Sequence, residues 1–139
     1  MTTPSPLLRK LLMICVAFFA CMGLAHFFGL KWPVLFVYWD TPFYAYQDKI
    51  ISFTLITYIA LFFGASRHRV MVPYALISIW GTVIGLSLVN MSAALAEVLN
   101  GGGVTIYWLI IATFGGLATV LTVLWLLDIR GTDGEGETV

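Results

Sequence analysis

The sequence predicts an all-α, polytopic integral membrane protein: a four-transmembrane-helix bundle with both termini in the cytoplasm (N-in/C-in). The first observation is composition, since 60% of the 139 residues are hydrophobic and 10% are charged. A soluble domain is usually near half apolar and a quarter charged, so a soluble fold cannot bury this much apolar surface. The second observation is that four apolar segments each come close to the length that crosses a bilayer.

The first predicted helix covers residues 11–30, which contain no Lys, Arg, Asp or Glu and follow Arg9 and Lys10. At about 1.5 Å rise per residue, these ~20 residues match a hydrocarbon core roughly 30 Å thick. A basic start before an apolar run is also typical of a signal peptide, and residues 23–25 offer a small-x-small cleavage site. Because the apolar run continues past that site, we interpret the segment as a membrane helix.

An aromatic connector follows over residues 31–47, interrupted by Pro33 and Pro42. Aromatic rings with an apolar body and a polar tip prefer the membrane interface. We therefore expect the connector to lie in the headgroup region on the outer side. A short helix is expected over residues 41–47, because Thr41 before Pro42 fits an N-cap followed by proline.

The second helix is predicted over residues 48–65, since the apolar run that begins at Ile50 is too short to span the bilayer alone. It ends at the polar turn of residues 66–69. The third helix is predicted over residues 70–96, with Pro73 in its first turn, where a missing N–H costs little.

The fourth helix is predicted over residues 104–127, after a break at the glycine-rich residues 100–103. Residues 131–139 are too short, polar and glycine-rich to fold, so we expect a disordered cytoplasmic tail. The chain is therefore predicted to be one transmembrane domain over residues 1–130 followed by that tail.

Orientation follows from the bias of Lys and Arg. In a four-span topology Lys31 and Lys49 fall on one side, and five basic residues fall on the other: Arg9, Lys10, Arg67, Arg69 and Arg130. The positive-inside rule places the second group in the cytoplasm, so the aromatic connector faces outward. We expect the chain to be an integral protein of a plasma membrane, the bacterial inner membrane.

Every predicted helix contains small residues four positions apart, a spacing that lets helix backbones approach closely in lipid. The pairs are Ala25 with Gly29, Ala60 with Gly64, Gly81 with Gly85, and Ala112 with Gly116. The Gly81 and Gly85 pair has the strict glycine form. It serves either packing within the bundle or association with another chain.

Polar side chains at the outer level form the one candidate site: His26, Asp40, Asp48, Lys49, Asn90 and Glu97. His26 and Asn90 lie below the headgroups, where an uncompensated polar group is unfavourable, so we expect both to face protein, water or ligand. They could share one cavity. Each residue also has a structural interpretation: hydrogen bonding between helices for His26 and Asn90, and a position at the membrane boundary or a helix end for the charged residues.

Several functional classes find no support in the sequence. The formal net charge is +0 and no Lys/Arg cluster is present, so we expect no nucleic-acid partner. We find no metal-ligand motif, phosphate loop, nucleophile elbow or paired-cysteine motif, and we expect no metal. The centres of the predicted helices carry no charge, which disfavours a proton relay. The sequence indicates neither a cofactor nor a catalytic residue.

Three functional hypotheses follow. The many small-residue pairs and the few reactive groups favour an accessory or structural subunit, or a scaffold, of a membrane protein complex. Such a protein is more often not an enzyme. The outer-level polar residues favour instead a binding protein or enzyme for a lipid-like or quinone-like small molecule at the outer leaflet. A small oligomeric transporter is the third. The expected partners are the lipid bilayer and other membrane protein subunits or copies of the chain itself.

Overall fold

The structure, a computed structural model, describes residues 3–30, 44–99, 101 and 103–135. Its secondary structure is helical, and four helices are long and apolar enough to cross a membrane. The prediction of an all-α protein with four candidate spans is therefore confirmed. The elements in chain order are α1 (Pro6–Phe28), α2 (Tyr44–Arg67), the short 3-10 helix η1 (Arg69–Met71), α3 (Val72–Asn90), α4 (Ala93–Leu99) and α5 (Thr105–Glu135).

The ends of α1 differ from the predicted bounds of 11–30 for local reasons. The helix begins already at Pro6, because a proline in the first turn lacks an N–H that would have no partner there. It ends at Phe28, where Gly29 adopts a left-handed conformation with φ 65°. The Gly29 N–H donates to the His26 carbonyl at 3.2 Å, so this glycine ends the helix and is not a packing residue.

The predicted third helix, residues 70–96, is in fact two helices. At Ser92 both the hydroxyl and the backbone N–H donate to the Val89 carbonyl, at 2.7 and 3.0 Å. A continuing α-helix would pair that carbonyl with the N–H of Ala93. The chain therefore turns between Asn90 and Ala93, although no glycine or proline marks the break.

Two further bounds differ from the predictions. The second helix begins at Tyr44 and not at residue 48, so part of the short helix expected over residues 41–47 belongs to α2. The connector over residues 31–43 lies outside the described residues. The last helix continues to Glu135, beyond its predicted end at residue 127. Residues 136–139 lie outside the description, and the disordered tail stays a prediction.

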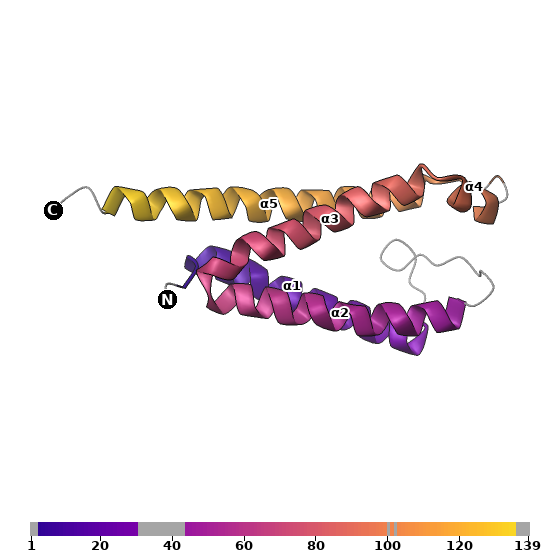
Figure 1. The fold of residues 1–139 in the computed structure, drawn as a ribbon, viewed down its shortest axis with the longest axis horizontal. Coiled ribbons are helices and arrows are strands. Elements are labelled where there is room, and N and C mark those ends of the chain that lie inside the picture. Colours follow the sequence, from indigo (N-terminus) through magenta and orange to yellow (C-terminus); the bar gives the residue numbers. More distant parts are fainter. Residues whose placement is uncertain (1–2, 31–43, 100, 102, 136–139) are drawn as a thin grey trace.

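The helices form two pairs, α1 with α2 and α3 with α5 (Figure 1). The pairs meet at the end where α1 begins and α2 and α5 end, which we call the basic end because Arg9, Arg67, Arg69 and Arg130 lie there. They diverge toward the opposite end, here called the His26 end (Figure 1). The buried apolar core reaches from the basic end to the middle of the helices, and includes Leu12, Phe19, Phe62, Ala75, Ile79 and Leu121.

A polar network closes the basic end. The Arg69 Nε atom lies 2.9 Å from Asp128 Oδ2, and a second guanidinium nitrogen donates to the Asp128 carbonyl at 2.7 Å. The Ser5 backbone N–H donates to Asp128 Oδ1 at 2.8 Å. The Arg69 guanidinium also lies over the Trp125 ring, 5.5 Å from its centroid. Asp128 thus joins the residue before α1, the turn before α3, and α5.

Several of the small residues that were predicted to pack lie in open space within the described chain. A Cβ atom added at Gly81, Gly85 or Gly116 would meet nothing within 4 Å, and Ala60 and Ala112 are exposed. The spacing of four gives the period of a helix face but not whether that face points toward the bundle. Association of these residues with another chain stays a prediction.

Close helix approach occurs instead at Gly23, which the spacing pattern did not select. A Cβ atom there would lie 3.6 Å from the Ser52 carbonyl oxygen and 3.7 Å from Leu55 Cβ on α2. Ala25 is also buried, whereas Gly64 lies under the flexible thioether of Met71. The α1 and α2 pair is therefore packed closely at Gly23.

Replacing Gly23 with leucine should destabilise the bundle by about 1–3 kcal/mol, because the added carbons overpack the contact with α2. Gly85→Leu is the matched control, since the space around Gly85 is open within the chain. Thermal unfolding of both variants in mild detergent measures the difference. Equal melting temperatures for the two variants would contradict the packing described here.

Candidate functional site

A cavity of about 460 Å³ lies between the two helix pairs, toward the His26 end. This volume is within the range of about 300–1,000 Å³ that is usual for small-molecule sites. Its deep part is apolar and aromatic: Phe19 on α1 lies 5.1 Å from the Tyr58 ring and 6.4 Å from the Phe114 ring, measured between centroids, and all three line the cavity. Leu55 and Leu86 add aliphatic surface.

The opposite end of the cavity is polar. His26 lies two turns beyond Phe19 on α1, and Tyr107 lies two turns before Phe114 on α5, a distance of about 10 Å along each helix axis. Asn90, the last residue of α3, lines the cavity as well. The cavity therefore has hydrogen-bonding groups at the His26 end and aromatic rings near the middle of the bundle.

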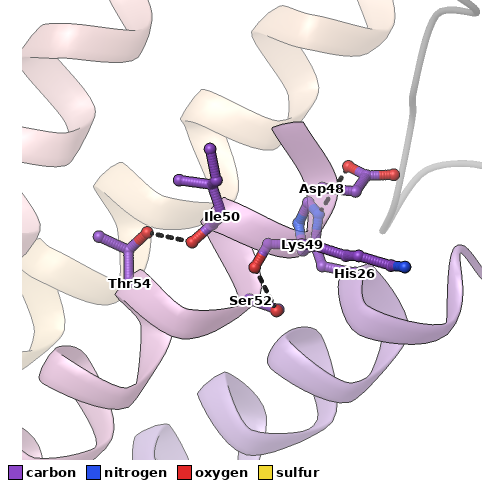
Figure 2. A network of polar contacts seen from close by, with 6 residues as sticks. All are labelled: His26, Asp48, Lys49, Ile50, Ser52 and Thr54. Carbon is purple, nitrogen blue, oxygen red and sulfur yellow. Dashed lines mark hydrogen bonds and ion pairs between the residues drawn. The ribbon is translucent and has the colours of Figure 1, made fainter. Parts of the chain in front are cut away.

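His26 and Asp48 form a buried pair at this polar end. Figure 2 shows the His26 imidazole on α1 facing the Asp48 carboxylate on α2, with Nδ1 and Oδ1 3.0 Å apart. The residues are 7% and 4% exposed. A carboxylate accepts hydrogen bonds, so His26 Nδ1–H is the donor, and the contact fixes both the tautomer and the orientation of the ring. His26 is the member of the pair that lines the cavity.

Two polar atoms near this end are buried without a hydrogen-bond partner among the described residues: Asp48 Oδ2 and Asn90 Nδ2. Leaving such an atom unsatisfied costs about 1–3 kcal/mol, and more for a charged group. Native proteins seldom retain this cost without a reason. Asn90 is also one of the residues that line the cavity, so an unsatisfied donor belongs to the cavity wall.

A hydrogen bond between α2 and α3 crosses the middle of the cavity wall. The Thr82 hydroxyl donates to the Ser78 carbonyl at 3.0 Å, so it accepts from the Tyr58 hydroxyl at 2.7 Å. Tyr58 and Thr82 both line the cavity. This bond joins the two helix pairs below the polar end and limits how far they can separate there.

Family models, curated proteins and solved structures give no match to this chain. Function is therefore inferred from the cavity and its side chains.

The residues that the sequence grouped at one level have different positions in the structure. His26 and Asp48 pair with each other, and His26 and Asn90 both line the cavity. Lys49 and Glu97 are exposed, and neither lines the cavity. Asp40 lies outside the described residues. In the part of the chain that the structure describes, no group of three or more His, Cys, Asp or Glu side chains could hold a metal ion.

Sequence reasoning missed the aromatic part of the cavity. Phe19, Tyr107 and Phe114 carry no sequence signal that separates them from the other aromatic residues of the apolar segments. Hydroxyl-bearing residues near the middle of two helices, Tyr58 and Thr82, were the available signal for a polar contact between spans. Their pairing needed the rotation of each helix, which the structure supplies.

Proposed function

We propose that this protein binds a small apolar molecule from the membrane in the cavity between its two helix pairs. The observation that carries the proposal is the cavity itself, which combines an aromatic interior with a polar end formed by His26 and Asn90. Ligand sites are typically concave and mostly apolar, with a few polar groups that fix orientation. Of the three hypotheses from the sequence, a binding protein for a lipid-like or quinone-like molecule fits this arrangement best.

The side chains favour binding over catalysis. His26 is held by Asp48 in one orientation, which suits it to position a bound group. The remaining polar groups of the wall are hydroxyls and one amide, on Thr54, Tyr58, Thr82, Asn90 and Tyr107. Such groups hydrogen-bond a ligand without reacting with it.

A cavity-filling substitution tests the proposal. Leu86→Trp places a larger ring in the cavity that Leu86 lines, so the chain should lose most of the apolar small molecule that copurifies with the wild type. The matched control is Leu88→Trp, because Leu88 is on the same helix but is 61% exposed and outside the cavity. Mass spectrometry of organic extracts gives the molar ratio of small molecule to protein. Equal ratios in the wild type and in Leu86→Trp would refute the proposal.

The proposed orientation puts the basic end in the cytoplasm of a bacterial inner membrane and the cavity in the outer leaflet. The support is the concentration of arginines at the basic end. With a membrane-impermeant maleimide on intact cells, we expect Gly103→Cys to be labelled and His68→Cys to be protected until the cells are opened. The wild type, with Cys15 and Cys21, gives the background. Labelling of His68→Cys on intact cells would reverse the orientation.

A role as an accessory subunit is a second candidate, favoured by one face of α3. Gly81 and Gly85 are open there, beside exposed Ile77, Ile84 and Leu88. Another helix could approach this face closely, as small residues allow in lipid. We expect Gly85→Leu to lower the molecular mass of the detergent-extracted particle if the face is an interface. An unchanged mass would argue against this second candidate.

A further inference from the structure

We infer that the ligand of the cavity is a neutral amphiphile whose head group carries a hydrogen-bond-accepting oxygen. The head lies between His26 and Asn90, and the apolar body lies on Phe19 and Phe114. This inference rests on the proposed binding function and adds the chemical class of the ligand. An alkyl-substituted benzoquinone is the simplest probe of that class.

The direction in which the ligand lies follows from the two ends of the cavity. His26, Asn90 and Tyr107 line the His26 end, and the Phe19 and Phe114 rings lie about 10 Å deeper. The hydroxyls of Tyr58 and Thr82 also line the deeper part, but they bond to each other. An amphiphile that placed its head at the aromatic end would bury its oxygen among rings and set its apolar body against the buried polar groups, which is unfavourable at both ends. The head therefore faces the His26 end.

The acceptor oxygen follows from Asn90. Asn90 is a lining residue of the cavity, and its Nδ2 atom is buried and has no partner among the described residues. A ligand oxygen that accepts from this amide removes the cost of the unsatisfied donor, whereas a pure hydrocarbon leaves that cost in place. A site built to hydrogen-bond an oxygen discriminates strongly against an analogue that lacks it.

The neutral charge follows from the basic and acidic groups around the site. The described lining contains neither Lys nor Arg, and Lys49 is exposed away from it. The Asp48 carboxylate lies behind the contact with His26, so a carboxylate or phosphate head would face a negative neighbour in a poorly solvated place. A cationic head would instead meet the N–H donor of Asn90. A neutral oxygen avoids repulsion from the Asp48 carboxylate and accepts from the Asn90 amide.

Three probes of equal chain length test the inference on the full chain in mild detergent: decylbenzoquinone, decylbenzene and decanoic acid. Specific binding is the binding in excess of that to Leu86→Trp, which corrects for partition into micelles. We expect decylbenzoquinone to bind the wild type tightest. Asn90→Leu should weaken decylbenzoquinone binding about tenfold and leave decylbenzene binding unchanged. Thr119→Ala, at an exposed hydroxyl on α5 outside the cavity, is the control that should bind like the wild type.

The outcomes separate the ligand class from the binding function. Retained decylbenzene binding shows that Asn90→Leu is folded. If decylbenzene binds the wild type as tightly as decylbenzoquinone, or if Asn90→Leu keeps full affinity for the quinone, the oxygen-accepting head is wrong while the binding function stands. Tighter binding of decanoic acid than of the quinone overturns the neutral head. If no probe binds above the Leu86→Trp background, both the inference and the proposed function are wrong.

Discussion

Replacing Asp128 with alanine should lower the free energy of unfolding by about 3–5 kcal/mol, among the largest effects of any single substitution in this chain. The Arg69 and Asp128 side chains are 15% and 8% exposed. Removing the carboxylate leaves the guanidinium without its counter-ion in a poorly solvated place, and it also removes the acceptor of the Ser5 N–H. Denaturation in mild detergent, followed by circular dichroism, measures the loss.

A double variant shows whether the loss comes from the unpaired charge. Arg69→Met with Asp128→Leu removes both charges and keeps most of the apolar volume, so we expect it to recover a large part of the stability that Asp128→Ala loses. Glu97→Ala, at an exposed carboxylate on α4, is the control for removal of an acidic group and should be close to neutral. If Asp128→Ala unfolds like the wild type, Asp128 does not hold the basic end together.

Removing His26 should lower the stability of the fold more than removing its partner Asp48. His26→Leu leaves a buried carboxylate without its donor and should cost about 3–5 kcal/mol. Asp48→Leu removes the acceptor of the His26 Nδ1–H, which should cost about 1–3 kcal/mol. Thermal or denaturant unfolding of the two variants measures the difference. Because His26→Leu disturbs the fold as well as the cavity, it is a poor single test of ligand binding.

The double variant His26→Leu with Asp48→Leu removes both polar groups and should be more stable than His26→Leu alone. Lys49→Leu is the control at the neighbouring, exposed position on α2 and should have a small effect. Additive losses in the double variant, with no recovery, would show that the two side chains do not act as a pair.

The spans could be predicted from the sequence because apolar length is a local property. Segments without charge, such as residues 11–30, match the bilayer whatever their neighbours do. The break after Asn90 could not be predicted in this way, since it depends on Ser92 occupying the Val89 carbonyl and not on a glycine or proline. The start of α1 at Pro6 followed a known rule for the first turn, which the apolar count overlooked.

The depth of the candidate-site residues in the membrane could be predicted from the sequence, but the direction in which their side chains point could not. His26, Asp48 and Asn90 were placed at one level because helix length fixes the height of each residue. Whether they meet depends on the rotation of α1, α2 and α3 about their own axes, and polar residues on mostly apolar helices leave that rotation undetermined. The same limit explains why Gly85 was expected at a helix contact and Gly23 was not.

A crystal structure of the chain extracted in mild detergent from its native membrane tests the central claim most directly. We expect the helix pairs to be separated at the His26 end, with non-protein density between them that contacts Asn90 at its polar end and Phe19 and Phe114 at its apolar end. The opposite result is a bundle in which α3 and α5 close against α1 and α2, so that protein side chains fill the space and the Asn90 amide bonds to a neighbouring helix. That result would contradict a ligand site between the helix pairs.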